Sequence, residues 1–508
     1  MLSEQAGTMC AELGSTSRGA GAIARLLLGP VGGIAAYFGV LGGVEGSSES
    51  AARAAGLLVL MAVWWVAEAL PLAVTSLLPL VLVPVLGLGD AKSAAAPYAD
   101  RIIFLFLGGF ILALGMEKWN LHRRIALRTI LLVGTEPRRI IGGLMLATAG
   151  LSLWMSNSAT AMMMLPIGMS IVRLVEDRTG KSSGNFGACV VLGIAYAASI
   201  GGMGTPIGSP PNALMLGVLE RMHGEHITFQ TWMIAGVPLV AAMLVCTWLL
   251  MTRVLLRFEL KRIPGERSLI QDELRAMGPM SRGELVVLVV FSCTVAGWVL
   301  REPAQALLAA LGAGNVADAI GSRVDDTTVA LAGAIALFMV PVNLKEGVFG
   351  MDWRTATRLP WGVLLLFGGG LALAAAVQAS GLAELVGGKL QSLHGLNPVV
   401  FIGVLALVST FASEVTSNVA QTNIFMPILS AVATAASVDP VTLMFPAVMA
   451  LSCAFMMPMG TAPNALAFGS GRVSMKKMAM TGFWLNIVAV VLVTIHATTL
   501  VPWVLIGR

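Results

Sequence analysis

Two short polar motifs interrupt otherwise apolar stretches of this chain. Ser-Asn-Ser at 156–158 stands inside LSLWMSNSATAMMMLP (151–166), and Ser-Asn at 417–418 stands inside FASEVTSNVAQTNIFMP (411–427). Hydroxyl, amide and carbonyl oxygens are ligands for a hard alkali cation, whereas helices that restart after a break present free N–H groups that favour an anion. The two motifs therefore predict a midplane site for a small anion together with at least two cations.

The same residues recur at a constant spacing along the chain. Ser156-Asn157 lie 261 residues before Ser417-Asn418, and the motifs GSPPNAL (208–214) and GTAPNAL (460–466) lie 252 residues apart. The spacing of 261 also relates Gly108-Gly109 to Gly369-Gly370, Leu121 to Leu382, Ser152 to Ser413 and Pro166 to Pro427. Two homologous halves of opposite orientation are typical of secondary transporters, which bind their cargo where the repeats meet.

The composition indicates a polytopic membrane protein in the lipid bilayer. The 508 residues are 57% hydrophobic and only 12% charged, with a mean hydropathy of +0.85, whereas soluble domains carry about 25% charge. Walker A, Rossmann and HExxH patterns are absent, which argues against a nucleotide-driven pump or a membrane protease. We predict no enzyme activity and no nucleic-acid partner.

The distribution of charge predicts the orientation of the chain. Segments 118–139 and 253–283 carry six and seven Lys or Arg residues, and segment 301–326 carries two. The first two are therefore predicted to be cytoplasmic and the third external. The apolar block 140–172 has cytoplasmic flanks on both sides, so it must enter the membrane and return, and block 398–436 is its mirror case from outside. The N-terminus is then cytoplasmic and the C-terminus external.

Hydropathy predicts the remaining membrane spans. They cover roughly 24–43, 52–68, 70–88, 102–117, 186–203, 229–252, 285–300, 327–342, 361–379, 441–457 and 482–505.

The paired Ser-Asn motifs, the stretch EKWNLHRRIAL (117–127) and the two Pro-Asn-Ala breaks resemble the divalent anion/sodium symporters. That family includes Na⁺/dicarboxylate, Na⁺/citrate and Na⁺/sulfate cotransporters, and the resemblance covers about residues 25–505. It implies an all-α polytopic fold with an inverted repeat, about eleven transmembrane helices and two re-entrant hairpins. It also implies a homodimer in the cell (inner) membrane that works by an elevator mechanism.

The resemblance implies a division into a scaffold and a moving transport domain. The expected segments are a disordered tail (1–19), scaffold parts 20–135 and 284–395, transport-domain parts 136–256 and 396–508, and a cytoplasmic linker (257–283).

The resemblance also implies the residues of the site. One sodium site would use Ser152, Ser156, Asn157 and Gly208, and the other Ser413, Ser417, Asn418 and Gly460. The anion, most simply a C4 dicarboxylate or citrate, would contact Ser156, Asn157, Ser158, Ser209, Ser417, Asn418 and Thr461.

The chain departs from the family pattern at two positions. The Thr that closes each motif is Ser158 in the first half and Val419 in the second, so one hydroxyl is lost. This leaves open a sulfate or other inorganic-anion symporter, or a sodium-independent dicarboxylate antiporter of the same fold. The role of Glu414, beside Ser413, is also left open. His223 and His226 have a metal-like spacing but no third ligand nearby, so we expect a solvated external loop there.

Overall fold

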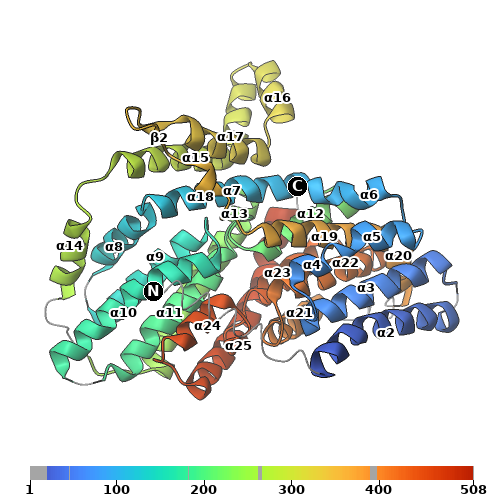
Figure 1. Ribbon diagram of the computed structural model, residues 1–508, viewed down its shortest axis with the longest axis horizontal. Coiled ribbons are helices and arrows are strands. Elements are labelled where there is room, and N and C mark those ends of the chain that lie inside the picture. Colours follow the sequence, from blue (N-terminus) through green and yellow to red (C-terminus); the bar gives the residue numbers. More distant parts are fainter. Residues whose placement is uncertain are drawn as a thin grey trace.

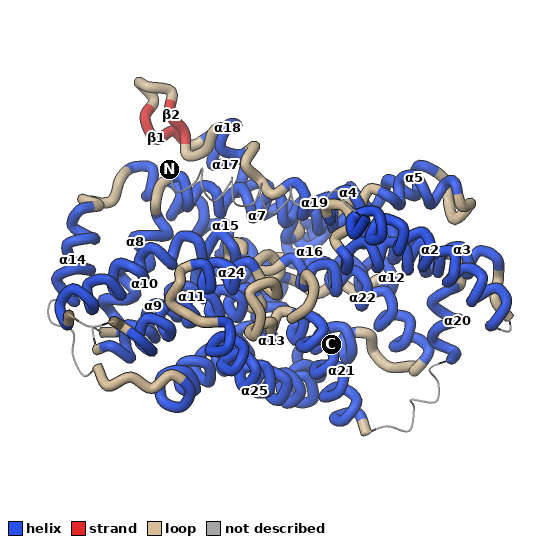
Figure 2. The backbone as a smooth tube through the Cα atoms, turned by 60° about the horizontal axis from the view of Figure 1, so that its bottom comes forward, coloured by secondary structure: helices blue, strands red, loops and turns tan. Residues whose placement is uncertain are grey.

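The structure is a computed structural model, and it describes residues 20–44, 46–134, 136–180, 182–260, 266–389 and 397–506. The N-terminal tail expected at 1–19 lies outside these residues. In the described part, nine helices are long and apolar enough to cross a membrane. The only strands described there form a two-stranded hairpin, β1 (Pro341–Asn343) and β2 (Val348–Phe349), which projects from the helical body (Figure 2). The prediction of an all-α, polytopic membrane fold is confirmed at this level.

The first half of the chain forms twelve α-helices in the described residues. They are α2 (Ala20–Gly43), α3 (Glu49–Ala67), α4 (Leu72–Thr75), α5 (Leu78–Val85), α6 (Ala91–Ala95), α7 (Arg101–Lys118), α8 (Leu121–Val133), α9 (Pro137–Ser152), α10 (Asn157–Thr179), α11 (Gly184–Gly202), α12 (Pro210–His223) and α13 (Phe229–Leu250). A 3₁₀ turn (Ala96–Ala99) follows α6, and a π-helical turn (Met251–Leu255) extends α13.

The second half begins with the short linker helix α14 and ends with the long helix α25. Its helices are α14 (Glu266–Ala276), α15 (Arg282–Ala310), α16 (Gly314–Arg323), α17 (Asp326–Met339), α18 (Trp353–Ala356), α19 (Trp361–Ala379), α20 (Leu382–Lys389), α21 (Pro398–Ser413), α22 (Asn418–Ala435), α23 (Val441–Leu451), α24 (Ala462–Gly469) and α25 (Met475–Val501), which a π-helical turn (Pro502–Ile506) extends. Helices from the two halves lie side by side: α11 packs on both α9 and α24, whereas α2 packs mainly on α3 at the opposite end of the molecule (Figure 1).

The predicted first hairpin is the helix pair α9 and α10. Pro137 occupies the first turn of α9, where its missing N–H costs nothing, and the helix ends at Ser152. After three non-helical residues, Ser156 caps α10 by accepting a hydrogen bond from the backbone N–H of Ala159 at 3.3 Å. The second pair, α21 and α22, repeats this design, with Pro398 in its first turn and the helix break at Ser413–Asn418.

Both outer ends of the first helix pair lie beside the C-terminal end of α13. Trp248 Nε1 donates to the carbonyl of Arg138, at the start of α9, at 2.9 Å. Asn185, at the start of α11 and just past α10, donates to the carbonyl of Arg257 at 2.8 Å. The two helices therefore run toward the centre of the molecule and back again.

Several predicted boundaries were wrong. The segment 118–139, expected as a basic loop, contains the helix α8, which buries Leu121, Ala126, Leu127, Ile130 and the ion-paired Arg124 and exposes Arg123 and Arg128. Such an amphipathic helix is too polar to register as a span. The expected span 441–457 ends at Leu451, where the chain unwinds before α24, and α15 continues to Ala310, ten residues past its expected end.

Candidate functional site

The two helix breaks and the two Pro-Asn-Ala motifs meet at one cavity. It has a volume of 790 Å³. All seven residues predicted to contact the anion line it: Ser156, Asn157, Ser158, Ser209, Ser417, Asn418 and Thr461. Because these residues come from segments up to 300 positions apart, the spacing argument located a set that the fold brings together.

The predicted first cation site forms a cluster of oxygen atoms. One terminal amide atom of Asn157 lies 2.8 Å from Ser152 Oγ, 3.1 Å from the carbonyl oxygen of Ala198 and 3.3 Å from that of Gly208. If this atom is the amide nitrogen, it donates to the three oxygens. If it is the amide oxygen, four oxygens face one another. Such a set of neutral oxygens fits a hard monovalent cation. Ser156, which was also predicted for this site, lines the cavity.

Gly208 allows the close approach on which this cluster depends. A Cβ at Gly208 would lie 2.6 Å from the carbonyl oxygen of Gly202 and 3.0 Å from that of Ser152. Any side chain would therefore collide with backbone that cannot move aside. The backbone of the α11–α12 break can approach the end of α9 only because residue 208 is glycine.

The predicted second cation site is less compact. Ser417, Asn418 and Gly460 line the cavity, but Ser413 is fully buried behind it and donates to the carbonyl of Thr410 at 2.8 Å. Asn418 Oδ1 is buried and has no hydrogen-bond partner among the described residues. An orphaned amide oxygen of a cavity-lining residue also suits a hard cation.

Four helices begin at this cavity. The helices α10, α12, α22 and α24 start at Asn157, Pro210, Asn418 and Ala462. Ser209 and Thr461 occupy the extended cap positions of α12 and α24. The positive end of each helix dipole lies at the cavity, which favours a bound anion, although α12 offers no N–H from its first two residues because both are proline.

Two buried asparagines hold the Pro-Asn-Ala breaks in shape. Asn212 Nδ2 donates to the carbonyls of Gly202 at 2.9 Å and Thr205 at 2.8 Å. Asn464 Nδ2 donates to the carbonyls of Ala454 at 2.9 Å and Met457 at 3.1 Å. The Asn of each motif therefore stabilises the unwound loop rather than binding the anion.

The cavity has a further wall that sequence reasoning missed. It is formed by residues outside the two repeated motifs: Arg25, Val66, Ala67, Glu68, Phe110, Pro360, Val363, Val415, Thr416 and Met459. Most of them are apolar and lie at helix ends, so no local pattern sets them apart. Glu68 is the one residue of this wall with an unusual feature in the structure. It ends α3 in the left-handed backbone region (φ 46°), an unusual conformation for glutamate.

The expectation of a solvated loop holds for His226, which is exposed in the non-helical segment 224–228, but not for His223, which is the last residue of α12 and is half-buried. His223 Nε2 lies 2.6 Å from Ser430 Oγ, and His226 Nδ1 lies 2.8 Å from a guanidinium nitrogen of Arg101. Among the described residues, no group of three or more His, Cys, Asp or Glu side chains could hold a metal ion. The two rings join helices rather than bind a metal.

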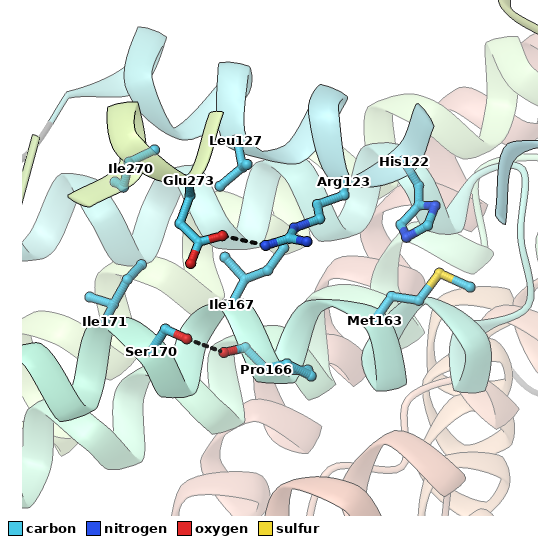
Figure 3. A pocket seen from close by; sticks show the side chains of 10 residues that line it. All are labelled: His122, Arg123, Leu127, Met163, Pro166, Ile167, Ser170, Ile171, Ile270 and Glu273. Atoms are coloured by element: carbon cyan, nitrogen blue, oxygen red, sulfur yellow. Dashed lines mark hydrogen bonds and ion pairs between the residues drawn. The ribbon is translucent and has the colours of Figure 1, made fainter. Parts of the chain in front are cut away.

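A second cavity, of 290 Å³, lies away from the helix breaks. It is bordered by α8, α10 and α14, and an ion pair between Arg123 and Glu273 crosses it (Figure 3). On its other side, Ser170 bonds within its own helix to the carbonyl of Pro166 at 3.0 Å. Its polar groups are paired with one another, so it marks the junction of three helices rather than a cargo site.

A helical membrane fold with a central cavity lined by helix starts defines a transporter. The chain belongs to the family described as the sodium:sulfate symporter transmembrane region, whose family model matches residues 34–506. This is a family of membrane transporters, so the chain is not an enzyme.

Curated relatives share this family over most of their length. The chain is 43% identical over 451 residues to a protein of Staphylococcus saprophyticus named sodium-dependent dicarboxylate transporter SdcS, which covers 88% of this chain and 85% of the relative. It is 42% identical, with the same coverage, to the SdcS protein of Staphylococcus aureus strain MRSA252. In fold it is similar to the YdaH transporter of Alcanivorax borkumensis, with a TM-score of 0.50, 14% identity, and coverage of 79% of this chain and 85% of the other.

Proposed function

We propose that the protein is a sodium-coupled secondary transporter of a divalent organic anion, a C4 dicarboxylate or citrate. The observation that carries this proposal is the single cavity lined by all seven anion-contact residues and bordered by an oxygen cluster. The name of the relatives, sodium-dependent dicarboxylate transporter, agrees with it.

The anion is bound by hydroxyls, amides and helix starts. Each of the four helix N-termini supplies about half a positive charge, and Ser156, Ser158, Ser209, Ser417 and Thr461 supply hydroxyl groups. The motifs themselves contain no Lys, Arg or His. Two sodium ions beside the anion would complete the neutralisation, which is the physical reason for coupling the two cargoes.

We assign eleven membrane crossings and two hairpins to these helices. The crossings are α2, α3, α4 with α5, α7, α11 with α12, α13, α15, α17, α19, α23 with α24, and α25. The outer ends of hairpin α9–α10 lie beside the C-terminal end of α13. Helix α22, by contrast, contacts His223, shortly before the N-terminal end of α13, through Ser430, so the two hairpins lie near opposite ends of α13. These placements and the basic loops support an inverted arrangement of the halves, with a cytoplasmic N-terminus and an external C-terminus in the cell membrane.

The moving part would be the transport domain, 136–256 with 396–508, which contains both helix breaks. The scaffold, 20–135 with 284–395, would form the homodimer, and 257–283 would link the two. The scaffold contributes Ala67, Glu68 and Pro360 to the cavity wall. These residues lie at the helix ends that we assign to the cytoplasmic side. The geometry therefore corresponds to an inward-facing state of an elevator cycle.

Uptake into proteoliposomes tests this proposal. Labelled succinate, citrate and sulfate are offered with and without an inward sodium gradient. We expect sodium-dependent uptake of succinate or citrate, and its loss in Asn157→Ala and Asn418→Ala, with Ser170→Ala on α10 as a control outside the site. Preference for sulfate, or uptake that is equal without sodium, would instead establish an inorganic-anion symporter or an exchanger.

A further inference from the structure

A carboxylate without a cationic partner is buried beside the second helix break. Glu414 is 4% exposed and follows Ser413 directly. Its oxygens accept four hydrogen bonds: from the backbone N–H groups of Phe455 at 2.7 Å, Met456 at 2.9 Å and Met457 at 2.9 Å, and from Asn486 Nδ2 at 2.6 Å. None of the ion pairs among the described residues includes it. Its four donors are uncharged N–H groups, which favour the ionised carboxylate without neutralising it.

In the first half of the chain, the equivalent loop N–H groups are hydrogen-bonded without a charged side chain. The position equivalent to Glu414 at the spacing of 261 is Leu153. The loop N–H groups equivalent to those of Phe455 and Met456 belong to Met203 and Gly204, and they donate to helix carbonyls at 3.2 and 3.0 Å.

The loops differ because their helices end at different points. Helix α11 continues to Gly202, whose equivalent at the spacing of 252 is Ala454, but α23 already ends at Leu451. The second break is therefore unwound by three more residues, and the carboxylate replaces the helix carbonyls as the acceptor. In the first half a neutral hydroxyl, that of Thr205, accepts from the N–H of Gly208 at 3.0 Å.

This charge lies against the predicted second cation site and not against the first. A Cβ built on Gly460 would lie 3.3 Å from Glu414 Oε2, whereas the atoms nearest the equivalent point on Gly208 are neutral carbonyls. In a low-dielectric interior, a negative charge a few ångströms from a cation site strongly raises the affinity of that site for the cation.

We propose that Glu414 makes the two cation sites unequal, so that sodium fills the second site, at Asn418 and Gly460, before the first site, at Ser152, Asn157 and Gly208. Glu414 is a positioning residue, because it acts through its charge and through the 452–461 loop and does not line the cavity. This inference rests on the proposed function, since it requires two sodium sites.

Sodium-dependent thermal stabilisation of the purified protein tests the inference without relying on transport. Melting is followed in NaCl and choline chloride mixtures of constant ionic strength, with no anionic substrate present. Asn157→Ala leaves only the second site, and Asn418→Ala leaves only the first. We expect Asn418→Ala to need about tenfold more sodium than Asn157→Ala for half of the stabilisation. Equal sodium requirements, or the reverse order, would overturn the proposal.

Two substitutions at Glu414 separate charge from bracing. Glu414→Gln keeps the length but removes the charge, and Glu414→Asp keeps the charge but shortens the side chain. We expect Glu414→Gln to raise the half-stabilising sodium concentration about tenfold and Glu414→Asp to raise it less. If Asp is as harmful as Gln, or more so, the residue is only a brace and the proposal fails. If the wild-type protein shows no specific response to sodium, the proposed function itself fails.

Discussion

Asn212 and Asn464 make the same pair of hydrogen bonds 252 residues apart. The acceptors of Asn212, the carbonyls of Gly202 and Thr205, become those of Ala454 and Met457 when 252 is added to each number. In both side chains the amide oxygen is buried without a described partner. A duplicated motif thus produces a duplicated contact, which supports the proposal of an internal repeat.

Removal of either asparagine amide should have matched effects. Asn212→Ala or Asn464→Ala leaves one buried carbonyl, that of Gly202 or Ala454, without a donor, at a cost of about 1–3 kcal/mol, and loosens one break at the cavity. We expect each variant to melt at a lower temperature and to lose most uptake, with Asn315→Ala, at the exposed start of α16, as a control for amide loss. A variant that retains full uptake would show that its break does not shape the site. Melting curves and succinate uptake measure the two effects.

The sequence located the site better than it located the helices around it. Ser156, Asn157, Ser417 and Asn418 stand out because polar side chains are costly in a membrane unless they have a function. The helix α8 was missed because an amphipathic, basic helix is indistinguishable from a cytoplasmic loop when only hydropathy is counted. The early end of α23 was missed because VTLMFPAVMALSC (441–453) is uniformly apolar, and the unwinding depends on Glu414, which is distant in sequence.

The outer wall of the cavity could not be predicted for a different reason. Phe110, Val363 and Met459 are ordinary apolar residues of membrane helices, and only tertiary packing brings them to the cavity. Ser413 shows the converse: its place in the repeat predicted a ligand, yet its hydroxyl bonds to Thr410 behind the cavity wall. A repeat therefore predicts equivalent positions but not equivalent contacts.

The hairpin topology predicts labelling from one side. Single cysteines near Arg138 and near Arg178, placed in a cysteine-free background, flank the pair α9–α10. Because both ends lie beside the C-terminal end of α13, we expect both to react with a membrane-impermeant maleimide from the cytoplasmic side only. A cysteine near Gly224, between α12 and α13, should react from outside and serves as the control. Reaction of the two flanks from opposite sides would contradict the re-entrant hairpin.

A cluster of charges joins α7 to the α12–α13 turn. Arg101 Nε donates to Glu220 at 2.9 Å, a second guanidinium nitrogen lies 2.8 Å from His226, and Arg221 pairs with Asp100 at 2.8 Å. If α7 belongs to the scaffold and α12 to the transport domain, these contacts hold the present state and must break during the cycle.

Acid should weaken this cluster through His226. Burial, and then the nearby Arg101 guanidinium, lower the pKa of His226 below its ordinary 6.5, although the carboxylates Glu220 and Asp326 oppose the shift. A base whose folded pKa is depressed stabilises the fold above the unfolded pKa and loses that contribution as pH falls. We expect the melting temperature to drop between pH 7.5 and 5.5 by on the order of 1–2 °C more than in His226→Gln. Parallel pH curves for the two proteins would exclude this role.

The second helix break has its hydroxyl in a different place from the first. Val419 and Ser158 are equivalent positions, and both line the cavity. Thr416 also lines it and accepts a hydrogen bond from Gln421, so its own O–H remains free to donate; its equivalent, Met155, is buried. The second half therefore offers an apolar surface at 419 and a hydroxyl at 416.

Val419→Thr should change the choice of anion with little effect on sodium. Threonine nearly preserves the shape of valine and adds one hydroxyl, and an unmatched polar group in a buried site costs about 1–3 kcal/mol. We expect the preference among succinate, citrate and sulfate to change several-fold, while the sodium titration stays nearly constant because residue 419 supplies no side-chain oxygen to either predicted cation site. Thr416→Val is the matched reciprocal change, and it should weaken binding of the anions that use the hydroxyl at 416. Competition uptake at fixed sodium, followed by a sodium titration, measures both effects. An unchanged ranking would show that position 419 does not face the anion, and a large loss of sodium affinity would place it at the cation site instead.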